Sequence, residues 1–185
     1  MRLKNNKFAV ILLTFVMFIN LLGSTVFAVE NDDPAEYTVT IYVEQVYRDD
    51  EGIGYQQTLT DAPLSYTAVE NQTLKEVIND IAGDEVYFKD AEWVDNYGNI
   101  DTSWLSSLDV YTDDLEDWVN YLSWYDYYPI GDEYVYEGES WMYFLGTPAN
   151  IPATVDDYPG TLIGDYVITG DITITLSFEY NIFTY

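Results

Sequence analysis

The sequence predicts an α+β fold in which strands predominate and one or two helices pack against them. Three observations predict it: an early segment alternates apolar and polar residues, one segment combines helical spacing with a capping signal, and the chain ends in a strand-like segment. At 185 residues the length fits a single domain.

The first 28 residues are predicted to be a secretory signal peptide. Three basic residues precede an apolar run over 8–19, and Val26-Phe27-Ala28 has the pattern that signal peptidase recognises. The run is shorter than the about 20 residues that a membrane span needs, which favours cleavage after Ala28 over a retained N-terminal anchor. We therefore expect a secreted, extracellular protein without a membrane span in the mature chain. A short acidic linker is expected over 29–36 and one domain over 37–185.

The folded region is expected to begin with strands. The segment Tyr37–Tyr47 alternates with a period of two, and one face carries Val39, Ile41 and Val43. A turn over 48–54 follows, and the segment 55–69 predicts further strand pieces interrupted at Pro63.

The clearest helix is predicted over Asn71–Gly83. Thr73 and Glu76 have the spacing of a capping box, and Gly83 is placed at the C′ position. The apolar residues of one helical face follow at i, i+3, i+4 and i+7: Leu74, Val77, Ile78 and Ile81.

Beyond the helix the patterns predict a weak strand over 86–93 and a second, short helix over 113–124. One face of that second helix would carry Leu115, Trp118, Val119 and Leu122. Strands are expected over 134–136 and 140–145, on either side of a turn at Glu137-Gly138. A terminal hairpin is expected to pair 166–168 with 172–180 across Thr169-Gly170-Asp171.

Composition excludes several functions. Without Cys or His the chain has no thiolate nucleophile, no Ser-His-Asp triad and no conventional zinc site. All 33 acidic residues but only three of the six basic residues lie after residue 28, so nucleic acid is not an expected partner. The high content of aromatic residues argues against disorder.

Two acidic patterns could carry chemistry. The spacing of Asp95, Asn99 and Asp101 around Gly98 places oxygen ligands near a turn, as calcium loops do. The EF-hand register fails, because loop positions one and twelve would be Trp93 and Trp104; an irregular calcium site and a solvated turn both stay open. A catalytic carboxylate pair would indicate a small glycoside-processing enzyme, but so many acids make this signal unspecific.

Aromatic residues are densest between 118 and 144. Within 124–128 four of five residues are Trp or Tyr, and no regular element can point them all inward. Trp124 and Tyr127 are therefore candidates for an exposed face that holds a planar ligand, a sugar or a peptide. The alternative is that most of these rings belong to the core.

Four segments occur in an order that resembles a known family: the strand over 37–47, the helix over 73–82, the segment 138–146 and the terminal segment 169–180. The chain is similar to a secreted bacterial domain of unknown function that itself resembles the C-terminal domain of transcobalamin. Its hallmarks are a Trp-containing strand before a small-residue turn and a late Gly-Asp turn. The resemblance implies a β-grasp-like fold, a mixed sheet with one packed helix.

The resemblance also implies a candidate ligand edge at Trp141, Tyr143 and Gly146, and a structural turn at Gly170-Asp171. The sequence departs from the family in having Leu145-Gly146-Thr147-Pro148 where Asn-Gly is usual, and in an aromatic and acidic insertion over about 91–130.

The function expected from these features is that of a secreted, non-enzymatic binding module. In its sharpest form it binds a corrinoid such as cobalamin, or a similar planar ligand, through the aromatic edge. The alternative is a surface adhesion or cell-wall interaction module that binds an extracellular polymer or protein and is stabilised by a cation such as calcium. A small glycoside-processing enzyme comes third.

Overall fold

The computed structural model describes residues 33–49, 52–95, 97–131, 133–152 and 159–184. The contacts within the chain divide it into two units, residues 1–33 and residues 34–185, and the second unit contains the fold. The predicted signal peptide and the first half of the predicted linker lie outside the described residues. Strands predominate, arranged in two sheets with one α-helix among the described residues, so the α+β class is confirmed at this coarse level.

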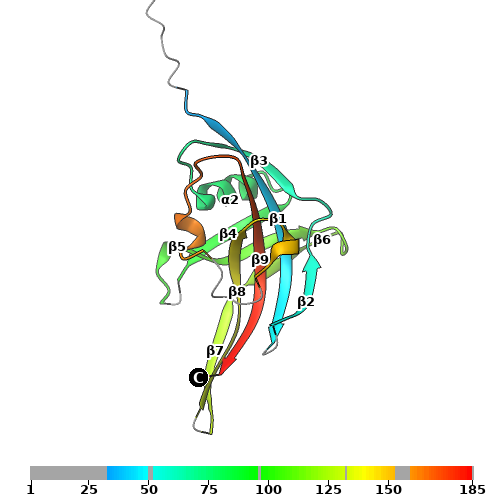
Figure 1. Cartoon of the computed structure of the whole chain (residues 1–185), viewed down its shortest axis with the longest axis vertical. Helices are drawn as coiled ribbons and strands as arrows, with labels where there is room; N and C mark the ends of the chain where they lie inside the picture. Colours follow the sequence, from blue (N-terminus) through cyan, green and yellow to red (C-terminus); the bar gives the residue numbers. More distant parts are fainter. Residues whose placement is uncertain (1–32, 50–51, 96, 132, 153–158, 185) are drawn as a thin grey trace, which may run out of the picture. The chain divides into compact units, whose positions relative to one another are not determined.

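The larger sheet has six strands. It contains β1 (Glu36–Asp49), β2 (Gly52–Thr58), β3 (Leu64–Val69), β7 (Trp124–Ile130), β8 (Glu133–Leu145) and β9 (Ile172–Thr184). The order is β2-β1-β9-β8-β7, and β3 also pairs with β1 (Figure 1). The first and last strands, β1 and β9, run parallel, whereas the other pairs are antiparallel. The sheet is therefore mixed.

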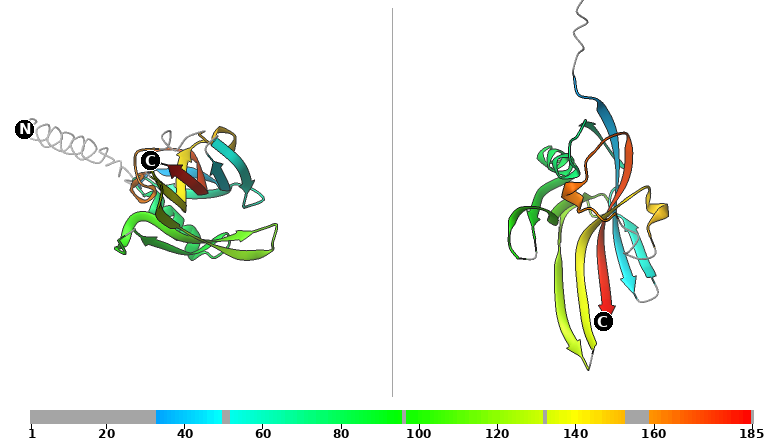
Figure 2. Two further views of the ribbon diagram at one scale, coloured as in Figure 1. Left: turned by 90° about the horizontal axis from the view of Figure 1, so that it is seen from below. Right: turned by 60° about the vertical axis from the view of Figure 1, so that its left-hand side comes forward.

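The smaller sheet is an antiparallel meander. It consists of β4 (Phe88–Val94), β5 (Ile100–Thr112) and β6 (Asp117–Leu122). A single residue, Ser123, separates β6 from β7, and its N–H donates to Ser106 O at 2.7 Å. The chain therefore passes directly from the smaller sheet to the edge of the larger one, as the two views in Figure 2 show.

The helix α2 (Leu74–Gly83) confirms the capping prediction. The Glu76 N–H donates to Thr73 Oγ1 at 3.3 Å, and Glu76 Oε2 accepts from the Thr73 N–H at 2.7 Å. The C-cap is Asp84, so Gly83 is the last helical residue and the C′ prediction was wrong. The described part of the connection between β8 and β9 contains the short 3₁₀ turns η1 (Pro148–Asn150) and η3 (Ile163–Asp165).

One hydrophobic core joins the two sheets and the helix. The helical face predicted from the sequence is buried, and it shares the core with Val39, Ile41 and Val43 of β1. The Trp141 indole of β8 connects the layers: its Nε1–H donates to Tyr121 O of β6 at 3.0 Å, and the Trp141 and Tyr121 rings meet edge to face at 5.9 Å. The burial of these apolar side chains, together with the contact between Trp141 and Tyr121, holds the smaller sheet against the larger one.

The second predicted helix is wrong. Residues 113–116 form a turn and 117–122 form β6, whose partner is β5. Leu115 and Leu122, two members of the expected helical face, are 67% and 55% exposed, whereas Val119 and Tyr121 face the core. Trp, Val and Tyr favour a half-buried pleated surface, and pairing with β5 supplies one.

A predicted turn and a predicted hairpin pairing were also wrong. β8 runs unbroken through Glu137 and Gly138 and pairs on both sides with β7 and β9. The terminal hairpin does not form, because Val167 makes only an isolated bridge to Thr73 while β9 pairs with β8 and β1. The strands predicted over 37–47, 55–69 and 172–180 are present.

Candidate functional site

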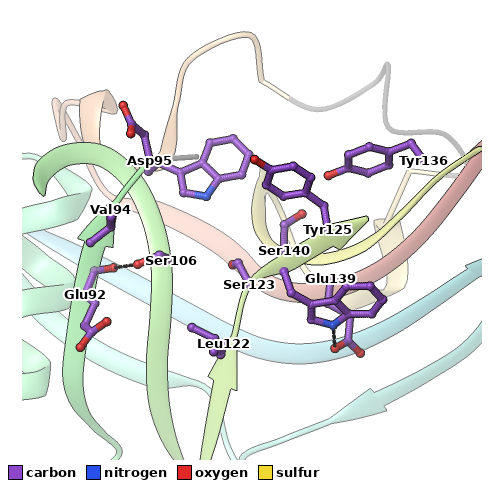
Figure 3. A pocket seen from close by; sticks show the side chains of 12 residues that line it. Glu92, Val94, Asp95, Ser106, Leu122, Ser123, Tyr125, Tyr136, Glu139 and Ser140 are labelled. Atoms are coloured by element: carbon purple, nitrogen blue, oxygen red, sulfur yellow. Dashed lines mark hydrogen bonds between the residues drawn. The ribbon is translucent and has the colours of Figure 1, made fainter. Parts of the chain in front are cut away.

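A pocket of about 310 Å³ opens where the smaller sheet meets the β7–β8 hairpin. We call it the junction pocket, and Figure 3 shows its lining. Four aromatic rings line it, those of Trp104, Trp124, Tyr125 and Tyr136. Three carboxylates join them, from Glu92, Asp95 and Glu139, with Ser, Val and Leu side chains filling the remainder. Among the described residues, no Lys or Arg lines the pocket.

Strand register explains how these side chains come together. Trp124 begins β7 and lies directly across from Glu139 of β8, and the Trp124 Nε1–H donates to Glu139 Oε2 at 2.6 Å. The next pair is Tyr125 with Gly138. A Cβ on Gly138 would lie 2.4 Å from Trp124 O and 2.8 Å from the Tyr125 Cβ, so only glycine allows this close approach.

The two tyrosines of the pocket stack on one another. The Tyr125 and Tyr136 rings lie 5.9 Å apart with an interplanar angle of 13°, and Figure 3 shows them side by side at one wall. Farther along the hairpin Tyr127 stacks on Tyr134 at 5.1 Å. The stacked pairs continue the aromatic wall outward along β7 and β8.

At the rim of the pocket, Asp95 organises a turn. Its Oδ1 accepts the N–H groups of Tyr97 and Asn99, each at 2.9 Å, and its Oδ2 accepts from the Asn99 side chain at 2.7 Å. The Asn99 side chain, followed by these backbone donors, holds the pKa of Asp95 below its usual value. Asp95 is therefore a carboxylate anion at neutral pH.

The residues predicted for calcium do not form one cluster. Asp95 and Asn99 share a turn, whereas the Asp101 carboxylate accepts from Lys75 Nζ at 2.6 Å, which lowers the pKa of Asp101. Within the part of the chain that the structure describes, no group of three or more His, Cys, Asp or Glu side chains could hold a metal ion.

The predicted ligand residues do not share one site. Trp124 lines the junction pocket, and Tyr127 is 56% exposed on the hairpin but is not part of the pocket lining. Gly146 lies in a turn at φ 126°, with its N–H donating to Thr173 O and its carbonyl accepting from Thr175 Oγ1, both at 2.9 Å. Its contacts are those of a structural turn.

Trp141 and Tyr143 do not form an exposed edge. Each is 3% exposed, and both line a second pocket of about 140 Å³ together with Trp104. The Tyr143 hydroxyl is buried without a hydrogen-bond partner in the described structure, and burial raises the pKa of Tyr143 to about 12. These rings belong to the core because β8 turns this face toward the smaller sheet.

Sequence reasoning missed Trp104, Tyr136, Glu92 and Glu139 as a set. Trp104 and Glu92 come from the smaller sheet, whose meander the sequence analysis did not predict. Among 33 acidic residues no single glutamate stands out. The alternation of Leu108 with Val110 was a usable sign of β5, but only the tertiary arrangement joins β4, β5 and the hairpin.

Comparisons of the chain with protein-family models, with curated proteins and with solved structures gave no match. Among the described residues, no helix has the length and apolar character needed to cross a membrane.

Proposed function

We propose that this protein is a secreted, non-enzymatic binding module that holds a small ligand in the junction pocket. The observation that supports this proposal most is the lining: four aromatic and three acidic residues line a pocket of about 310 Å³. Ligand pockets are typically concave and mostly apolar, with a few polar groups that orient the ligand. The lower end of their volume range is about 300 Å³. A ligand of modest size fits this volume.

A β-grasp-like fold, similar to the transcobalamin C-terminal domain, is part of this proposal. It is supported by the mixed sheet, in which the first and last strands lie parallel at the centre, and by α2, which packs over the core in the connection between them. The insertion then corresponds to most of the smaller sheet and β7. Cobalamin is the corrinoid form of the proposed ligand, and it would extend beyond the pocket along the aromatic wall.

A surface adhesion module is the second candidate, favoured by the exposed hairpin. β7 is the edge strand of the larger sheet, and Tyr125, Tyr127 and Tyr134 of the hairpin are 46%, 56% and 48% exposed. A sheet edge with exposed rings is suited to an extracellular polymer or protein.

Calorimetric titration of residues 29–185 with cobalamin, choline and N-acetylglucosamine tests the proposal. The expected result is a saturable isotherm with one of these ligands that is lost in Trp124→Ala and kept in Tyr55→Ala. Tyr55 is the matched control, because it is a 53% exposed ring that does not line the pocket. Binding that survives Trp124→Ala would contradict the proposed site, and cell or polymer association without small-ligand binding would favour the adhesion module.

A further inference from the structure

The charges around the junction pocket narrow its ligand class, an inference that rests on the proposed function. Glu92, Asp95 and Glu139 line the pocket, and no Lys or Arg of the described chain does. An anionic ligand would meet three carboxylates without a compensating cation. A neutral ligand would leave their charge uncompensated.

The three basic residues of the described chain are already paired elsewhere. Arg48 pairs with Glu179 at 2.7 Å, Lys75 with Asp101 at 2.6 Å and Lys89 with Asp109 at 3.7 Å. No side chain of the described structure therefore places a cation in the junction pocket.

Both lysines show how this protein accommodates an ammonium group. Lys89 Nζ lies 4.6 Å from the centre of the Trp118 ring and also pairs with Asp109. Lys75 Nζ lies 5.3 Å from the centre of the Trp93 ring and also pairs with Asp101. In each case the ammonium contacts an indole face and an aspartate, an arrangement in which ring quadrupole and carboxylate both attract it.

The junction pocket has the same components without the ammonium. Trp104 and Trp124 supply indoles, Tyr125 and Tyr136 supply further rings, and the three carboxylates supply the charge. Glu139 Oε2 is fixed by the Trp124 Nε1–H, and no described residue donates a hydrogen bond to Glu139 Oε1. We infer that the junction pocket binds a small organic cation, an ammonium or guanidinium group with a compact apolar body, between its rings and its carboxylates.

Choline and its uncharged carbon isostere, dimethylbutanol, test this inference, because they have nearly the same shape and differ in charge. In calorimetric titrations of residues 29–185 we expect choline to bind saturably and the isostere to bind at least about tenfold more weakly, equivalent to about 1.4 kcal/mol. Choline affinity should also fall as salt concentration rises, because carboxylate attraction is screened.

Two glutamine variants isolate the charge. Glu139→Gln keeps an oxygen acceptor for the Trp124 Nε1–H, and Glu92→Gln keeps the side-chain size. Each variant should weaken choline binding several-fold and leave the affinity for the isostere unchanged. Glu133→Gln is the matched control, because Glu133 is an exposed residue of β8 that does not line the pocket. Equal weakening by Glu133→Gln would mean a non-local charge effect and would overturn the inference.

The outcomes separate this inference from the proposed function. If the isostere or N-acetylglucosamine binds as well as choline, and Trp124→Ala abolishes that binding, the pocket is a binding site but the cation inference is wrong. If choline does not bind while another ligand binds through Trp124, the pocket is likewise a binding site and the cation inference is wrong. If no ligand binds and Trp124→Ala changes nothing, both are contradicted.

Discussion

Arg48 of β1 and Glu179 of β9 form an ion pair inside the protein. Arg48 Nε donates to Glu179 Oε2 at 2.7 Å, and the two side chains are 6% and 0% exposed. The Ser177 hydroxyl donates to Glu179 Oε1 at 2.7 Å, and an Arg48 guanidinium N–H donates to Pro152 O at 2.7 Å. The pair thus joins the two parallel strands to the segment that follows β8. It lies on the sheet face opposite the hydrophobic core.

Replacing Arg48 should destabilise the fold strongly. Arg48→Met leaves the Glu179 carboxylate buried without its cation, and we expect a loss of about 3–5 kcal/mol in the free energy of unfolding, measured by urea denaturation. Lys75→Met is the control, because its partner Asp101 is 88% exposed at the side chain, and it should cost about 1 kcal/mol or less. Adding Glu179→Leu should restore much of the stability lost in Arg48→Met. No recovery would contradict this account.

The stability cost of Arg48→Met should depend on pH, and the direction of that dependence follows from the pKa of Glu179. Burial raises the pKa of Glu179, and Arg48 opposes that rise. Without Arg48 the pKa in the folded state rises further above its unfolded value, so stability is retained below the unfolded pKa and lost as pH rises through the folded one. The cost of Arg48→Met should therefore be smaller below the ordinary glutamate pKa of about 4.3 than at neutral pH.

Local sequence signals predicted local structure well and long-range pairing poorly. The α2 prediction was confirmed because its capping box and apolar face are encoded within ten residues. The helix predicted over 113–124 was wrong. Trp118, Val119 and Leu122 fit both a helical and a strand pattern, and pairing with β5 stabilises the strand. The glycine at position 138 suggests a turn in the sequence, whereas in the fold its lack of a Cβ allows the close approach of β7.

Trp141 and Trp124 should differ in their effect on stability. Trp141 is buried and its indole N–H is bonded to Tyr121 O, so Trp141→Ala should cost about 3–5 kcal/mol. Trp124 is 42% exposed, so Trp124→Ala should cost clearly less, about 1 kcal/mol. Urea denaturation of both variants checks this order; equal costs would contradict the assignment of Trp141 to the core and Trp124 to the pocket wall.

Gly138→Ala should disturb the pocket through the backbone. The new Cβ would clash with Trp124 O and the Tyr125 Cβ, which cannot move without weakening the pairing of β7 with β8. We expect a loss of about 1–3 kcal/mol in urea denaturation, together with weaker ligand binding. Gly170→Ala is the control, because its Cβ would meet no atom within 4 Å. A Gly138→Ala variant as stable as Gly170→Ala would argue against this strand register.

Tyr180 should control the ionisation of Glu137. Hydrogen bonds from the Tyr180 hydroxyl, and then from the Tyr128 hydroxyl at 2.8 Å, hold the pKa of Glu137 below its usual value. Because the folded pKa is lowered, this contribution to stability is present above the unfolded pKa and lost as pH falls through the folded value. Tyr180→Phe should raise the Glu137 pKa in a carboxyl-carbon NMR titration, whereas Tyr127→Phe should leave it unchanged. An unchanged pKa in Tyr180→Phe would contradict the assigned bond.

The candidate site was less predictable than the fold. Sequence reasoning found Trp124 from the local density of aromatic residues, and it named Trp141 and Tyr143 from the resemblance. It had no means of joining Trp104 of β5 to Glu139 of β8, because the smaller sheet places them together only in the folded chain. The burial of these aromatic residues could not be inferred from the sequence either. An aromatic residue in a strand gives the same sequence pattern whether its face of the sheet contacts solvent or a second sheet.

The most direct test of the junction pocket follows the indole N–H signals of the five tryptophans in a proton–nitrogen NMR spectrum. Choline is titrated into residues 29–185, with N-acetylglucosamine and cobalamin in parallel. The account predicts saturable shifts for Trp104 and Trp124, with much smaller shifts for Trp93, Trp118 and Trp141, which lie outside the pocket lining. Shifts confined to those three, or none with any of the three ligands, would contradict it.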